Sequence, residues 1–172
     1  ASSYVTSYVP TYGSATARNG DKALNENNSN LPTGYPFSLF AEVDVVDTTS
    51  GYPISLNWSD SYQHYYALAY YGGYWRILAR NVTQTTGTSS VVPSIGVHKV
   101  VGVFTETEVS LYIDGSLAVT IPQGQTFNTN VNDLLIGQLR NVVDDGTRST
   151  IIQALVFNQE LTNQEAIDLT TI

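Results

Sequence analysis

Residues 109–119 read VSLYIDGSLAV, and this stretch decides the fold class that the sequence predicts. Apolar and polar residues alternate on both sides of Asp114 and Gly115, as they do in strands that bury one face. An Asp-Gly pair supplies the positive-φ residues that a two-residue hairpin turn of the primed type requires. The stretch therefore predicts an antiparallel hairpin with strands at 109–113 and 116–121.

Similar strand patterns lie on both sides of this hairpin. Turn signals recur about every ten residues, which is typical of antiparallel sandwiches and barrels. A second hairpin is predicted to turn at Gly72 and Gly73. The predicted strands are 37–46, 53–58, 65–71, 74–79, 97–104, 109–113, 116–121, 134–136 and 151–157.

One short helix is predicted after the last strand. It begins at Leu161 and Thr162, and Thr162 has a glutamate, Glu165, at the spacing of a capping box. At the other end of the chain, residues 19–36 are rich in Asn, Gly and Pro and predict a long loop. We therefore expect residues 1–36 to be a lead-in strand and loop packed on the sandwich, and residues 37–172 to be the domain itself.

The composition narrows the classes of function. The 172 residues are 42% apolar and 13% charged, which fits one domain rich in strands and turns. A net charge of −8 with only 7 Lys and Arg argues against binding of nucleic acid or of anionic membrane surfaces. No apolar run approaches the roughly 20 residues that span a bilayer, so we expect no membrane insertion. The absence of cysteine excludes disulfides, zinc–thiolate sites and thiol nucleophiles.

The order of features in the last third of the chain resembles a known family. A hairpin closed by Asp-Gly, a strand ending in Ile136 and Gly137, and ALVFN at 154–158 before the capped helix look like the C-terminal half of concanavalin A-like, laminin-G/pentraxin-like jelly rolls. The resemblance covers about 37–172 and implies an all-β antiparallel sandwich with one short C-terminal helix. Folds of this kind usually hold sugars rather than transform them, so it implies a non-catalytic, lectin-like domain.

A shorter resemblance concerns the parent protein. SYVPT at 7–11, with Gly13, Thr16 and Arg18, looks like a segment common in phage tail and other virion proteins, where it leads into a lectin-like domain. It implies a fibre, spike or tail protein, a location on the virion surface or outside the cell, and a homotrimer, because virion spikes are commonly trimers. The lack of any methionine predicts a processed chain or a piece of a longer protein.

The Gly72-Gly73 hairpin indicates a candidate glycan site. Directly opposed residues of a hairpin share a face. One face then carries Trp75 and other core residues, while the other has an alanine floor with tyrosines and arginines around it. Aromatic faces cover the C–H patches of sugars, and arginines suit carboxylated or sulfated glycans. The predicted contacts are Tyr65, Tyr71, Tyr74, Arg76 and Arg80. A subunit interface enriched in Tyr and Arg explains the same face equally well. So does a plain half-wet sheet surface, because Tyr is a good strand former.

Calcium and catalysis are the other site hypotheses. Laminin-G and pentraxin-like domains usually hold calcium through loop oxygens, for which the candidates are Asp144 and Asp145, with Asp60 and Asp133 as further options. Laminarinase-like glycosidases of the same fold carry Glu-x-Asp-x-x-Glu; here Glu42 and Asp44 match, but Asp47 replaces the final Glu. An acidic turn and a solvated strand face explain both sets more simply.

The two histidines predict no catalytic triad, because neither has a Gly-x-Ser-x-Gly elbow as partner. His98 alternates with core residues and is expected to be a hydrogen-bonded residue of the sheet. Three functions stay open: a lectin-like domain of a virion that recognises polysaccharide, a structural or decoration domain whose tyrosine face is an oligomer interface, and a carbohydrate-binding module or glycosidase domain of a secreted enzyme.

Overall fold

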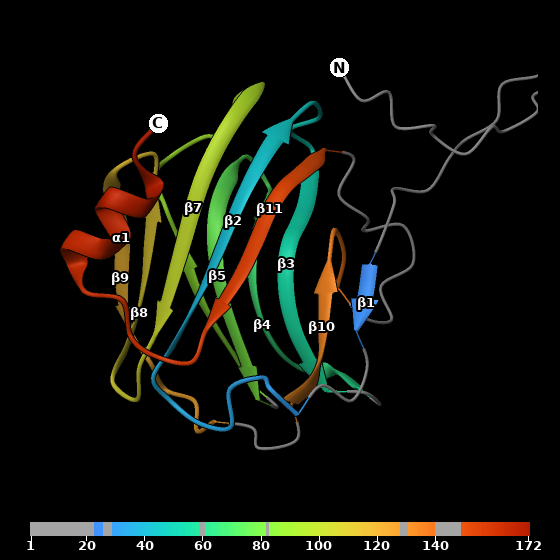
Figure 1. The fold of residues 1–172 in the computed structure, drawn as a ribbon, viewed down its shortest axis with the longest axis vertical. Coiled ribbons are helices and arrows are strands. Elements are labelled where there is room, and N and C mark those ends of the chain that lie inside the picture. The colour runs from blue at the N-terminus through green and yellow to red at the C-terminus, as the bar shows by residue number, and fades with distance from the viewer. Residues whose placement is uncertain (1–22, 26–28, 59–60, 82, 128–130, 140–148) are drawn as a thin grey trace, which may run out of the picture.

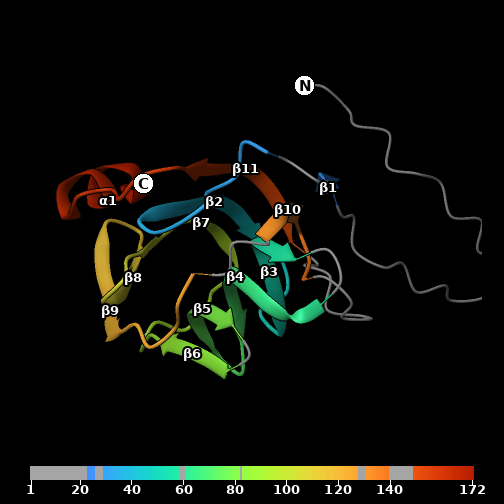
Figure 2. The same ribbon diagram turned by 90° about the horizontal axis from the view of Figure 1, so that it is seen from below.

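The computed structural model describes residues 23–25, 29–58, 61–81, 83–127, 131–139 and 149–172. They form two antiparallel sheets that pack face to face, with one helix at the C-terminal end (Figure 1). Seen from below, the layers are separate: β11, β2 and β7 run along one, and β3, β4, β5 and β6 curve along the other (Figure 2). The predicted all-β sandwich is confirmed.

Neighbouring strands pair in an order that mixes distant parts of the chain. The six-stranded sheet has the order β1 (Ala23–Asn25), β10 (Val131–Ile136), β3 (Ser50–Trp58), β4 (Ser61–Tyr71), β5 (Tyr74–Asn81) and β6 (Thr83–Thr88). The five-stranded sheet has the order β11 (Thr150–Phe157), β2 (Phe37–Val45), β7 (Gly96–Phe104), β8 (Glu108–Ile113) and β9 (Ser116–Pro122).

Every predicted strand has a counterpart, but two strands were not predicted. β1 has only 3 residues and pairs with β10 inside the stretch expected to be a loop. β6 reads TQTTGT and has no large apolar residue to reveal its buried face. It packs closely because Gly87 leaves room: a Cβ there would lie 2.6 Å from Ile77 Cγ2 of β5. Tertiary pairing, rather than strand propensity, makes both segments strands.

Both predicted hairpin turns have the expected backbone. Gly72 and Gly73 have φ of 60° and 82°, and Asp114 and Gly115 have φ of 48° and 78°. Positive φ at both central residues defines the type I′ turn, whose twist matches that of the strands it joins. Tyr71 and Tyr74 are therefore directly opposed, as the sequence predicts.

The main core lies between the sheets and is centred on packed rings. Phe37 of β2 stacks on Phe104 of β7 with ring centroids 4.7 Å apart, and Tyr66 of β4 meets Phe37 edge-on at 5.1 Å. All three rings are fully buried. Offset and edge-on pairs add about 0.5–1.5 kcal/mol each to the burial of their surface. These contacts fix the two sheets against each other.

The helix α1 (Asn163–Thr170) covers the outer face of the five-stranded sheet. Thr162 is its N-cap, and the capping box with Glu165 is confirmed. Hydrogen bonds from the Thr162 backbone and hydroxyl lower the pKa of the Glu165 carboxyl. At the other end, Lys99 Nζ donates to the backbone oxygen of Thr171 at 3.0 Å, where a cation complements the helix dipole. Across the residues that the structure describes, no helix has the length and hydrophobicity of a membrane span.

Candidate functional site

The β4–β5 hairpin separates two faces, and its inner face is as predicted. Trp75 is fully buried between the sheets, and its indole ring meets the Tyr70 ring edge-on at 5.0 Å. The inward face also buries the other residues assigned to the core, namely Tyr66, Leu68, Ile77 and Ala79. The hairpin is thus anchored by its inner side chains.

The outer face is less open than the sequence predicts. Ala67 and Ala69 are fully buried and Tyr65 is only 5% exposed. A second apolar cluster covers this face, because Leu139 from the segment after β10 and Tyr52 from β3 pack against the alanines. The expectation of a solvent-exposed alanine floor is therefore wrong for the middle of the hairpin.

The open part of this face lies beside the Gly72-Gly73 turn. We call Tyr71, Tyr74, Arg76 and Thr88 the turn surface. Tyr74 is 40% exposed and pairs with Tyr71 across the turn. The Arg76 guanidinium lies over the Tyr71 ring, 4.4 Å from its centroid. Tyr71 also stacks on Tyr52, with centroids 6.0 Å apart, so its ring is held in place.

Arg76 is held in position by its own hydrogen bonds. Its Nε donates to the backbone oxygen of Tyr71 at 3.1 Å, and its Nη1 donates to Thr88 Oγ1 at 2.9 Å. Its Nη2 has no hydrogen-bond partner among the described residues. A fixed guanidinium with one donor edge to spare is suited to a carboxylate or sulfate. Thr88 was missed by sequence reasoning because it lies on the unpredicted strand β6.

Tyr65 and Arg80 form a separate pair at the far end of the hairpin. They are opposed in the β4–β5 register, six positions from the Tyr71–Tyr74 pair, which is about 20 Å along the strands. Arg80 is half-buried, and its guanidinium is 6.0 Å from the Tyr65 ring centroid. The structure therefore divides the five predicted contacts into two groups.

Burial of tyrosine hydroxyls makes the free energy of unfolding depend on pH in the alkaline range. Burial raises the pKa of Tyr35, Tyr65 and Tyr70 above the usual 10, and an Arg80 hydrogen bond only partly offsets this for Tyr65. The three tyrosines contribute fully to the free energy of unfolding below pH 10. This contribution is lost as the pH rises further, because the unfolded chain releases the tyrosine protons at a lower pH than the folded chain does. We expect the free energy of unfolding to fall steeply above about pH 10.

Denaturant unfolding followed by circular dichroism between pH 8 and 11.5 checks this expectation. Tyr70→Phe loses the 2.7 Å hydrogen bond to Ser149 and should be about 1 kcal/mol less stable at pH 8. Above pH 10 its free energy of unfolding should fall less steeply with pH than that of the wild-type chain. An equal slope in Tyr70→Phe and the unchanged chain would contradict the assignment.

Only two of the three carboxylates of the glycosidase hypothesis share a face of β2. β2 pairs with β7 without a register shift from Phe37 to Val45, so Glu42 and Asp44 face outward from the five-stranded sheet. Asp47 lies beyond the strand, where its Oδ1 accepts from the Thr49 amide at 2.8 Å. The bulge that would bring a third carboxylate to Glu42 is absent from this described β2–β7 ladder.

The calcium candidates are mostly outside the described residues. Asp60, Asp144 and Asp145 fall there. Asp133 lies on β10 opposite Asn57 and is fully buried. In the part of the chain that the structure describes, no three His, Asp or Glu side chains gather into a metal-binding group.

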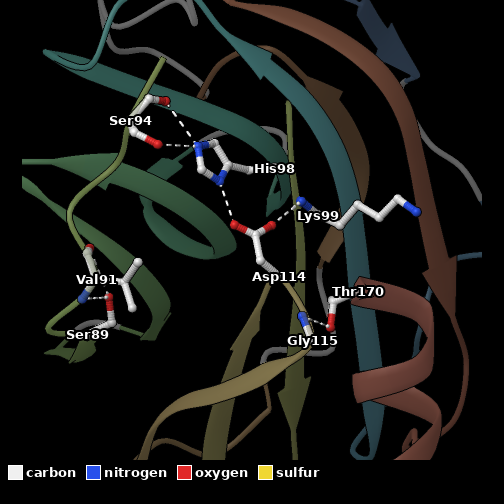
Figure 3. Close-up of polar contacts among 8 residues, drawn as sticks. All are labelled: Ser89, Val91, Ser94, His98, Lys99, Asp114, Gly115 and Thr170. Atoms are coloured by element: carbon white, nitrogen blue, oxygen red, sulfur yellow. Dashed lines mark hydrogen bonds and ion pairs between the residues drawn. The ribbon is translucent and has the colours of Figure 1, made fainter. Parts of the chain in front are cut away.

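His98 is a hydrogen-bonded sheet residue, as predicted, but it belongs to a chain of contacts that the sequence did not indicate (Figure 3). His98 Nδ1 lies 2.7 Å from Asp114 Oδ2, and Nε2 lies 3.0 Å from Ser94 Oγ. Asp114 Oδ1 accepts from the Lys99 amide at 2.9 Å. The residue types are those of a serine–histidine–aspartate triad, although the sequence has no Gly-x-Ser-x-Gly elbow.

A further contact argues against a catalytic role for this chain. His98 Nε2 also lies 3.0 Å from the backbone oxygen of Ser94. This carbonyl oxygen shares Nε2 with the Ser94 hydroxyl, and Nε2 is the nitrogen that a general base needs free. The two ring nitrogens thus contact Asp114 on one side and Ser94 on the other. The His98 side chain thereby joins the connection between β6 and β7 to the β8–β9 turn.

Comparisons with known proteins agree with the fold. The model of the concanavalin A-like lectin/glucanases superfamily matches residues 17–166. A comparison with curated proteins finds no match.

Three solved structures illustrate the likeness. The CBM40 of the Ruminococcus gnavus IT-sialidase bound to alpha2,3 sialyllactose has a TM-score of 0.68 and 18% identity, over 81% of this chain and 84% of that chain. A second structure is Domain 4 of AbnA, a GH43 extracellular arabinanase from Geobacillus stearothermophilus, in complex with arabinotriose. It has a TM-score of 0.71 and 13% identity, over 89% of both chains. The heptameric SAP-like pentraxin of Limulus polyphemus has a TM-score of 0.69 and 14% identity, over 89% of this chain and 76% of that chain.

At these identities the likeness concerns the fold, and the fold is one that carbohydrate-binding modules and lectin-like domains use. The family match covers most of the chain and agrees with the two-sheet sandwich and its late capped helix. The chain belongs to the concanavalin A-like lectin/glucanases superfamily.

Proposed function

We propose that this chain is a non-catalytic glycan-binding domain, with the turn surface as its contact site. The observation that carries the proposal is the fixed Arg76 guanidinium beside the exposed ring of Tyr74. A ring face covers the apolar side of a sugar, and the spare edge of Arg76 binds an anionic substituent. Binding of sialyllactose and arabinotriose by domains of the same fold supports this reading.

An acidic glycan fits this surface best. The chain as a whole has a net charge of −8, so a cation that stands at an exposed aromatic surface is a local exception. Tyr65 makes no direct contact in this proposal because it is nearly buried. Arg80 remains a second contact for a glycan long enough to span about 20 Å of the hairpin.

The parent protein is part of the same proposal. We place the domain on a virion fibre, spike or tail, exposed on the virion surface or outside the cell, in a homotrimer. The segment at 7–11 supports this and lies outside the described residues. The alternative parent is a secreted carbohydrate-active enzyme. Domain 4 of the extracellular arabinanase favours that alternative, since it matches this chain over 89% of its length.

A glycan array followed by calorimetry on the best ligand tests the contact site. We expect acidic glycans to bind, Arg76→Ala to weaken them by about 10- to 100-fold, and Tyr74→Ala by about tenfold. Lys99→Ala is the charge-matched control, because this lysine donates to the C-terminal end of α1 on the other sheet. It should leave affinity unchanged. If no acidic glycan binds, or if Lys99→Ala weakens binding as much as Arg76→Ala, the proposed contact site is wrong.

One observation favours an oligomer interface as the second candidate function. Val46, Val92 and Ile95 are 56%, 61% and 67% exposed. The connection that carries Val92 and Ile95 adjoins the turn surface, because the Trp75 amide donates to the backbone oxygen of Val91 at 3.1 Å. Val45 pairs with Gly96, so Val46 and Ile95 lie at the same end of β2 and β7, and exposed aliphatic groups that gather mark protein contacts. Analytical ultracentrifugation of Tyr74→Ala separates the two functions: a lost oligomer supports the interface, and an unchanged mass with lost binding supports the glycan site.

A further inference from the structure

A cavity of about 480 Å³ lies at the end of the sandwich opposite the turn surface. Residues 29–36, which lead into β2, form most of its wall, and Asn158, which follows β11, completes it. β2 starts at this end, and its other end leads to β3, whose first residue, Ser50, pairs with Tyr71. The segments meet at the lower edge of the molecule in Figure 1. A volume of this size accommodates a small ligand.

The lining combines polar groups with apolar ring surface and contains no charged side chain among the described residues. Hydroxyls come from Ser29 and Thr33, and amides come from Asn30 and Asn158. Pro32, Pro36 and the Tyr35 ring supply the apolar part. Hydroxyl-bonding groups beside C–H and ring surface suit a saccharide, and the lack of charge suits a neutral one.

The cavity wall is held in place before any ligand arrives. Asn158 Nδ2 donates to the Asn30 backbone oxygen at 3.1 Å and joins the two segments. Leu31 is 6% exposed and belongs to the main core. The Tyr35 ring stacks on Phe37 at 5.9 Å, and its hydroxyl accepts from Gln123 Nε2 at 3.0 Å. A wall that is held by these contacts loses little conformational entropy on binding.

We propose that this cavity is a second glycan subsite, specific for a neutral saccharide unit. It is independent of the turn surface, which has an arginine and lies at the other end of the sandwich. A glycan-binding domain with both sites would bridge two chains of a polysaccharide or bind two kinds of glycan. Simultaneous engagement of two sites raises the apparent affinity for a multivalent surface.

Gly34 lines the cavity and offers a bulky variant with little risk to folding. A Cβ at Gly34 meets no atom within 4 Å, and the backbone there is not in the positive-φ region. Gly34→Trp therefore adds bulk beside the cavity without straining the chain. Gly124→Trp is the matched control, since Gly124 also has open space around its Cβ and does not line the cavity.

An array carrying neutral and acidic glycans, with the neutral hits repeated by calorimetry, tests the inference. We expect neutral glycans to bind the unchanged chain, Gly34→Trp to weaken them by about tenfold or more, and Gly124→Trp and Arg76→Ala to leave them unchanged. Circular dichroism melts of Gly34→Trp confirm that it folds. If no neutral glycan binds, or if Gly34→Trp binds neutral glycans as well as Gly124→Trp does, the subsite is wrong. Acidic-glycan binding sensitive to Arg76 stands or fails separately.

Discussion

Trp75→Ala should lower the free energy of unfolding by about 3–5 kcal/mol, the range found when a large buried aromatic is truncated. Trp75 is fully buried and packs edge-on against Tyr70 at 5.0 Å and His98 at 5.8 Å. Removing the indole leaves a cavity where the β4–β5 hairpin meets the five-stranded sheet. For a chain of this size such a loss lowers the melting temperature by roughly 10 °C. Urea unfolding followed by circular dichroism measures it.

The neighbouring residue supplies the control for this change. Tyr74 is 40% exposed and faces the other way, so Tyr74→Ala should alter stability by no more than about 0.5 kcal/mol. The pair of variants thus measures which side of the hairpin is buried. Equal costs for Trp75→Ala and Tyr74→Ala would contradict the assignment of faces on which the glycan proposal depends.

Gly102→Leu should be destabilising by about 3 kcal/mol through overpacking. Gly102 lies on the inner face of β7, and a Cβ there would be 2.6 Å from Leu68 Cδ2 and 2.9 Å from Ile77 Cδ1 of the opposite sheet. The missing side chain is what allows these two branched residues to fill the space between the sheets. A larger group at this position must displace both of them.

A double-mutant cycle tests that explanation. Leu68→Ala alone should cost about 2–5 kcal/mol, but Gly102→Leu with Leu68→Ala should cost at least about 1 kcal/mol less than the two single costs added. Leu68→Ala with Thr162→Ala is the control, because the N-cap of α1 lies outside this contact and the two costs should add. Additivity in the first pair would show that Gly102 is not reserved for the Leu68 side chain.

The hairpins and most strands were predictable because their signals are local. Gly72 with Gly73 and Asp114 with Gly115 need positive φ, and the alternation beside them orients each strand. The division of the β4–β5 hairpin into an inner face with Trp75 and an outer face with Tyr74 follows from the same register. These features depend only on neighbours in the sequence.

The features that sequence reasoning missed depend on distant parts of the chain. Leu139 covers the alanines of β4, although nothing near either segment indicates that they meet. Gly102 reads as a weak position in a strand, and only the opposite sheet explains it. The cavity requires Asn30 and Asn158, which lie near opposite ends of the chain. A pattern of period two gives the direction of a side chain but not what covers it.

The pairing of β11 with β2 has a consequence for synthesis of the protein. β2 lies between β7 and β11, and the register that pairs Phe157 with Ser38 joins the last strand to the first long strand of the described residues. Long-range pairing of this kind slows folding, because the entropy cost of closing a large loop precedes the stabilising contacts between the two strands. On the ribosome, one edge of β2 stays unpaired until β11, which ends at Phe157, has left the exit tunnel. A chain truncated before Thr150 keeps that edge open for association with other nascent chains.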